Sequence, residues 1–176
     1  MAENNWIYSN NEDNTSRYLL GVEGEKTIFC FGVNPSTAEP NAADATIRKV
    51  TKIAQHNNYD SWMMLNVYPV RATKFDDLTK KLDVAEHNRN IETIKNVLSN
   101  HKKADIWLAF GNHIFHRDYL KKCFVEIYES LSEFEINWYA TKVNKSQAPA
   151  HPLYQKNESE FIKFDTIEEF IEELKN

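Results

Sequence analysis

Polar side chains that can bind or hydrolyse a ligand follow the first long apolar run of the chain. Asn34 and Pro35 come directly after the apolar, β-branched stretch 26–33. The proline rigidifies the turn, and the asparagine amide offers both a donor and an acceptor. Ser36, Thr37 and the following backbone N–H groups can hold an anion or a ligand carbonyl. The alternative is a turn that only ends a strand.

A second asparagine, Asn66, closes the apolar run 62–65. Its side chain either bonds the neighbouring backbone or reads the polar edge of a ligand, and the equivalent placement of two asparagines favours a ligand. Tyr68 can stack on a planar ring. Arg71 can meet a phosphate, with an exposed surface ion pair as the alternative.

A histidine, His151, follows the polar loop 142–150 and precedes Pro152. Its imidazole can donate a hydrogen bond or carry a proton near neutral pH. A histidine that only caps a loop is the alternative. His113 and His116 are three residues apart and suggest a metal pair together with His151, but the ligands are too few, and we expect no metal site.

Several common cofactor motifs are missing from the sequence. There is no glycine-rich Gly-Lys-Ser phosphate loop, no Gly-x-Ser-x-Gly elbow and no dinucleotide fingerprint. These absences argue against ordinary ATPases, serine hydrolases and NAD enzymes, and we expect no cofactor.

Composition predicts a soluble, cytoplasmic protein of one domain. The chain has 176 residues, of which 41% are hydrophobic, enough to bury a core. Residues 1–5 do not resemble a signal peptide, and no stretch approaches the roughly 18 apolar residues of a membrane span. Cys30 lies within the apolar run 28–31 as an expected buried hydrophobe, which suits a reducing compartment.

The net charge of −5 comes from one end of the chain. Segment 157–176 holds seven acidic residues and two lysines, so the remainder is formally neutral. Because phosphate neutralisation supplies most of the affinity for duplex DNA, a basic excess would be expected of a tight duplex binder. Its absence disfavours that class of protein.

Apolar periodicity predicts strands that alternate with helices. Asp44 suits a helix N-cap because apolar residues follow at helical spacing up to about 57–58. We expect strands at 26–33, 61–67, 106–110 and 135–141, an additional antiparallel edge strand at 17–22, and helices at 44–57, 86–100, 114–131 and 166–175.

This alternation predicts a three-layer α/β/α domain over 1–176, with a central, mainly parallel four-stranded sheet. Ligands of such sheets bind beyond the carboxyl ends of the strands. Asn34, Asn66, Gly111 and His151 all follow such ends. We therefore expect the loops that carry them to converge on one pocket.

The motifs together resemble a family of bacterial and phage domains of unknown function, DUF1643. The resemblance covers residues 26–154 and rests on five segments: Phe31–Ala38, Asp44–Thr46, Asn66–Pro69 with Arg71, Trp107–Gly111 and His151–Leu153.

More distantly, the motif order is similar to the uracil-DNA glycosylase superfamily, which carries Asn-Pro after its first strand and His-Pro in a C-terminal loop. This resemblance implies a uracil-DNA glycosylase-like sheet. It also implies that Asn34 positions a hydrolytic water, that Asn66 reads the base edge and that His151 stabilises charge on a base carbonyl. Asp44 would supply a nearby carboxylate, or only cap its helix.

Two positions differ from the superfamily pattern: Ser36 replaces a glycine, and Leu153 replaces a serine. Three functions follow as hypotheses. The first is hydrolysis of an N-glycosidic bond in single-stranded or damaged nucleic acid or in a nucleotide. The second is nucleotide binding without chemistry, with Arg48 or Arg71 at a phosphate. The third is a structural or interaction domain without a ligand.

Overall fold

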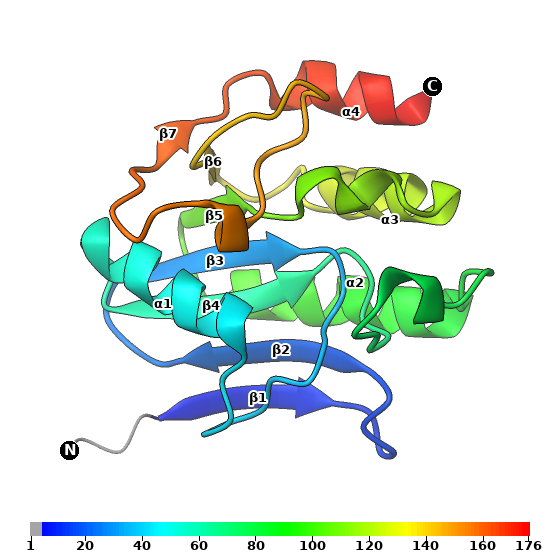
Figure 1. Cartoon of the computed structure of the whole chain (residues 1–176), viewed down its shortest axis with the longest axis horizontal. Coiled ribbons are helices and arrows are strands. Elements are labelled where there is room, and N and C mark those ends of the chain that lie inside the picture. The colour runs from blue at the N-terminus through cyan, green and yellow to red at the C-terminus, as the bar shows by residue number, and fades with distance from the viewer. Residues whose placement is uncertain (1–4) are drawn as a thin grey trace.

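The computed structural model describes residues 5–176 and centres on a seven-stranded sheet (Figure 1). Residues 1–4 lie outside the described residues. They belong to segment 1–5, in which no signal peptide is expected. The strand order is β1-β2-β4-β3-β5-β6-β7. The strands are β1 Trp6–Asn10, β2 Arg17–Val22, β3 Thr27–Gly32, β4 Ser61–Asn66, β5 Ala104–Leu108, β6 Ile136–Ala140 and β7 Ile162–Lys163.

The sheet is mixed. The pairs β3 with β4, β3 with β5 and β5 with β6 are parallel. The pairs β1 with β2, β2 with β4 and β6 with β7 are antiparallel. The loops that follow β3, β4, β5 and β6 therefore all leave the sheet at the same side, at the carboxyl ends of these strands.

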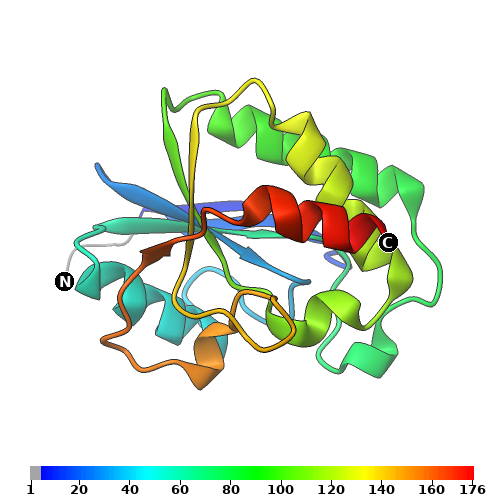
Figure 2. The ribbon, with the colours of Figure 1, turned by 90° about the horizontal axis from the view of Figure 1, so that it is seen from above.

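Helices cover both faces of the sheet (Figure 2). Helix α1 lies on one face, and α2, α3 and α4 lie on the other. The α-helices are α1 Ala45–His56, α2 Val84–Leu98, α3 Asp118–Ser130 and α4 Ile167–Lys175, and the short 3-10 helices are η1 Phe75–Asp77, η2 Gly111–Phe115 and η3 Pro152–Tyr154. The α/β class expected from the sequence is confirmed.

Strand β3 shows why the sequence gives this arrangement. Ile28 and Cys30 pack on the side of α1, whereas Phe29 and Phe31 pack on the side of α2, α3 and α4. A strand that is buried on both faces reads as an unbroken apolar run. The same alternation places Trp107 of β5 on the α1 side.

Helix α1 begins where the sequence predicted. The carboxylate of Asp44 accepts a hydrogen bond from the backbone N–H of Ile47 at 2.9 Å. After α1, Asn58 adopts a left-handed backbone with φ of 63°, a conformation that ends helices and that asparagine tolerates.

Four details of the predicted elements are corrected by the structure. Strands β1 and β7 were not predicted, because one is a half-buried edge strand and the other has two residues. Strand β2 is antiparallel as expected, but it lies between β1 and β4 instead of at the edge. The helix expected at 114–131 is divided into η2 and α3, and the helix expected at 86–100 runs from Val84 to Leu98.

Candidate functional site

Asn34 ties the loop after β3 to the loop after β4. Its Nδ2 donates to the carbonyl oxygens of Pro35 and Ala72, both at 3.0 Å. Because carbonyl oxygens only accept hydrogen bonds, the side-chain atom that faces them is the nitrogen. Oδ1 has no hydrogen-bond partner within residues 5–176. Asn34 therefore offers a ligand or water an acceptor only.

Asn66 is enclosed in the protein interior, without contact with solvent. Its side chain is fully buried, and neither Nδ2 nor Oδ1 has a hydrogen-bond partner in the described chain. It sits opposite Gly32 in the parallel pair, and a Cβ atom on Gly32 would be 3.1 Å from the Asn66 Oδ1. The expected ligand-reading asparagine thus points to the α1 side but has no access to solvent.

A buried amide without partners is costly. An unsatisfied buried polar group costs about 1–3 kcal/mol, and most such groups in folded proteins are paired. The backbone around Asn66 is well held, since its carbonyl accepts from Nδ2 of Asn90 at 2.8 Å. The main chain at Asn66 is therefore held in place, whereas both polar atoms of its side chain lack a hydrogen-bond partner in the described chain.

His151 is a neutral donor in this structure. Its Nδ1 accepts from the backbone N–H of Leu153 at 3.2 Å, so the ring proton lies on Nε2. Burial, with a smaller contribution from the nearby His113, lowers the pKa of His151 to about 4 against the opposing effect of Asp44. His151 thus caps η3, as the structural alternative predicted, and retains an Nε2–H for a ligand.

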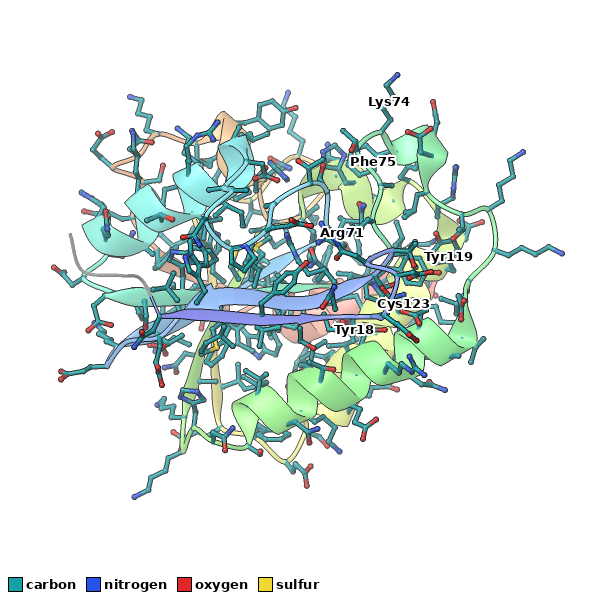
Figure 3. All side chains as sticks on the ribbon, turned by 90° about the horizontal axis from the view of Figure 1, so that it is seen from below. Tyr18, Arg71, Lys74, Phe75, Tyr119 and Cys123 are labelled. Carbon is teal, nitrogen blue, oxygen red and sulfur yellow. The ribbon has the colours of Figure 1, made fainter. Side chains whose placement is uncertain are left out.

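Three aromatic rings connect the loops after β4, β5 and β6. Phe75 stacks on His113 with ring centroids 3.9 Å apart, and His113 meets the edge of His151 at 5.5 Å. Figure 3 shows Phe75 next to Lys74, and Phe75 packs against the core cluster on the side of α2, α3 and α4. The sequence did not identify Phe75, and no motif around it carries a signal for this contact.

Tyr68, which was expected to stack on a planar ring of a ligand, belongs instead to the core. Its side chain is fully buried, and its ring packs edge-on against Tyr119 at 5.2 Å. Its hydroxyl accepts from the backbone N–H of Asp83, the N-cap of α2, at 3.0 Å. No face of Tyr68 is therefore free to stack on a ligand, because the chain turns toward α2 directly after β4.

Arg71 is a structural clamp in this conformation. Nη1 donates to the carbonyl of Ser36, and Nη2 donates to the hydroxyl of Tyr8 at 2.7 Å and to Oδ1 of Asn14 at 3.1 Å. Glu39 lies 3.8 Å from Nη2. Both terminal nitrogens are therefore engaged, and neither the expected phosphate contact nor a simple exposed pair describes this arginine.

The loops line two pockets, not the single one expected. One, of about 430 Å³, is bordered by Ser36, Thr37 and Arg71. The other, of about 450 Å³, is bordered by Gly111, His113 and His151. Asn34 and Asn66 border neither pocket. The loops that carry the site residues leave the sheet at the carboxyl ends of the parallel strands, but these residues do not line one common pocket.

The family of this chain follows from its motif region. Residues 17–153, which contain Asn34, Asn66 and His151, match the family model described as "Protein of unknown function (DUF1643)". The chain belongs to the DUF1643 family. No curated protein and no solved structure gives a significant match to this DUF1643 protein.

The described residues of this DUF1643 protein hold neither a cluster of metal ligands nor a membrane-spanning helix. Residues 5–176 contain no group of three or more His, Cys, Asp or Glu side chains that could hold a metal ion. The same residues contain no helix that is long and apolar enough to cross a membrane.

Cys30 and Cys123 are buried free thiols, and burial raises the pKa of both.

Proposed function

We propose that this DUF1643 protein recognises a nucleobase or nucleotide and hydrolyses an N-glycosidic bond. One observation carries the proposal: Asn34 presents an unused acceptor, and His151 presents a neutral N–H donor, on loops that leave the same edge of the sheet. An acceptor can orient a water, and a donor can stabilise negative charge on a base carbonyl.

The topology supports the same proposal. The neighbouring strands β4, β3, β5 and β6 run parallel, with Asn34-Pro35 after β3 and His151-Pro152 after β6. This placement agrees with a uracil-DNA glycosylase-like fold. Ligands of open parallel sheets bind at that edge.

The chemistry of these residues favours early bond breaking. An asparagine cannot take a proton from water, so the bond between the sugar carbon and the base nitrogen breaks first, and its electron pair goes to the base. His151 Nε2–H donates to the base carbonyl where negative charge collects. Water held by the Asn34 Oδ1 then attacks the oxocarbenium-like sugar and finally loses its proton to solvent or the departing base.

Asn66 fits the proposal as the residue that reads the base edge. Its amide offers both donors and an acceptor, none of which is used within the described chain. Because Asn66 is fully buried, the proposal requires a movement that opens this position when the ligand binds.

Base release is the direct test. Deoxyuridine-containing and damaged single strands, duplexes and free nucleotides are incubated with the protein, and released base is measured by chromatography. We expect release, with His151→Ala and Asn34→Ala each reducing the rate by about 100-fold or more. His56→Ala, an exposed position at the end of α1, is the matched control. No release from any substrate at high protein concentration contradicts the proposal.

Nucleotide binding without chemistry is a second candidate function. It is favoured by the role of Asp44, whose Oδ1 accepts the capping hydrogen bond of α1 from the backbone N–H of Ile47, a structural role for this carboxylate. Thermal unfolding with mono-, di- and cyclic nucleotides tests it, because a ligand at 100 times its Kd adds about 2.7 kcal/mol of stability. Stabilisation without base release, which is lost in His151→Ala, would support this candidate over the first.

A further inference from the structure

A third pocket lies away from the candidate site, between α1 and the strands β1, β2 and β4. It measures about 400 Å³ and shares no residue with the two pockets at the carboxyl edge. Its helix wall includes Ile47, Thr51 and Gln55, and its sheet wall includes Trp6, Val22 and Trp62. Within residues 5–176, α1 is the only α-helix on this face of the sheet, and Trp6 of β1 and Val22 of β2 are only partly buried.

Two indole rings form a corner in this pocket. The rings of Trp6 and Trp62 are 6.2 Å apart at 76° to each other. Trp6 Nε1 donates to Oδ1 of Asn41 at 2.8 Å, which fixes the orientation of the half-buried ring. Trp62 is only 4% exposed, so a flat ring in this corner stacks on the half-buried indole of Trp6, an arrangement that is favourable for aromatic pairs.

The rim of this pocket carries positive charge. Arg48 and Lys52 lie one helical turn apart, are exposed, and border the pocket. Helix α1 contains no acidic residue. Arg48 is tethered at one end, since its Nη1 donates to the carbonyl of Ala43 at 2.6 Å.

The one carboxylate in the lining, Asp60, is already engaged. It accepts hydrogen bonds from the backbone N–H groups of Lys26 at 2.8 Å and of Glu25 at 3.3 Å. These bonds lower the pKa of Asp60, with Lys26 as the larger cause. Asp60 directly precedes β4, is held against the turn before β3 and stays ionised, so the pocket lining carries two cationic side chains, Arg48 and Lys52, and one anionic side chain.

We propose that this pocket binds a small planar aromatic molecule that carries an anionic group, of which a nucleoside monophosphate is the model. The ring lies in the corner of Trp6 and Trp62, and the anion meets Arg48 and Lys52. The size and the mixture of apolar walls with a few polar groups are typical of small-molecule sites. This site is independent of the candidate site and goes beyond the proposed function.

Binding is measured by isothermal titration calorimetry with AMP, adenosine and inorganic phosphate as separate probes. AMP is expected to bind, and adenosine and phosphate are each expected to bind about tenfold more weakly, because each keeps one half of the ligand. A single-stranded oligonucleotide that binds more tightly than AMP would overturn the assignment to a small molecule. Equal affinity for phosphate and AMP would overturn the role of the aromatic corner.

Variants localise the binding. Trp6→Leu and the double variant Arg48→Glu/Lys52→Glu are each expected to weaken AMP binding by about tenfold or more. Lys102→Glu, an exposed position in the turn before β5, is the matched charge-reversal control and should leave binding unchanged.

His151→Ala separates this proposal from the glycosidic one, because it should abolish base release and leave AMP binding in the α1 pocket intact. Loss of AMP binding in His151→Ala, or unchanged binding in both pocket variants when their melting curves show folded protein, overturns the inference. A Trp6→Phe variant that keeps most of the affinity supports the aromatic contact independently of folding.

Discussion

Gly111 and His151 lie so close that a Cβ atom on Gly111 would fall 3.0 Å from the Cβ of His151. Gly111 also has a φ of +60°, which L side chains rarely adopt. The end of β5 therefore depends on glycine twice, for its backbone conformation and for the approach of the loop that carries His151.

Gly111→Ala is expected to lower the free energy of unfolding by about 1–2 kcal/mol from the left-handed backbone alone, and to displace His151. Urea denaturation measures the stability. Gly111→Asn separates the two causes, because asparagine tolerates this φ but keeps the Cβ atom. If Gly111→Asn is as stable as the parent and releases base at the same rate, the contact with His151 has no consequence.

Asn66→Ala is expected to leave the free energy of unfolding unchanged or to raise it, because it removes a buried amide whose atoms have no partners. Ligand binding at the candidate site should be lost. The matched variant Asn90→Ala removes the bond to the Asn66 carbonyl and should cost about 1–2 kcal/mol. An Asn66→Ala protein that unfolds, or that keeps full ligand binding and activity, would show that this amide does not serve a ligand.

Acid should destabilise the protein through His151. Its pKa is lowered to about 4 in the folded state from an ordinary 6.5, so between these values the unfolded chain binds the extra proton. Stability should fall as the pH decreases from 6.5 toward 4, by roughly 3 kcal/mol from this group, and then level off.

Urea denaturation across this pH range tests the prediction. His151→Gln should flatten the pH dependence, whereas Asn112→Ala, a neutral neighbour in the same pocket, should not. His113, whose pKa is also lowered by burial, contributes in the same direction. An unchanged slope in His151→Gln would show that His151 is not held neutral by the fold.

Arg71→Ala should cost about 2–3 kcal/mol of stability, because it removes the donor to the Ser36 carbonyl and to the Tyr8 hydroxyl and one of the three donors to Asn14 Oδ1. Arg71→Lys should not restore the loss, since one ammonium cannot reproduce the planar fork of donors. Arg48→Ala, on the exposed face of α1, should change stability by less than about 0.5 kcal/mol. Equal denaturation midpoints for Arg71→Ala and Arg48→Ala would contradict the structural role of Arg71.

Local signals in the sequence predicted several elements near their true positions. The cap at Asp44 needed only the residues of its own helix, and the apolar run of β3 follows from burial on both faces. The two added strands could not be predicted in this way. Strand β1 is stabilised by pairing with β2, and the two residues of β7 pair with β6, so neither carries a strong pattern of its own.

For the candidate site, too, some features could be predicted from the sequence and others could not. Strand ends and turn residues determined that Asn34 and His151 would reach one edge of the sheet, because parallel neighbours end at the same side. Which partners each side chain meets was decided by contacts between segments far apart in the chain. Asn34 is held by Ala72, 38 positions away, and Arg71 by Tyr8, 63 positions away.

The sequence by itself thus determined the α/β class, the cap of α1, the polar strand ends and the family, since these depend on periodicity and short motifs. Only the tertiary structure decided that Asn66 is enclosed, that Tyr68 belongs to the core under α2, and that the loops form two pockets. The physical reason is that burial depends on which distant segment covers a residue. The strand order and the packing of the loops decide which segment covers each residue, and no local sequence pattern encodes that choice.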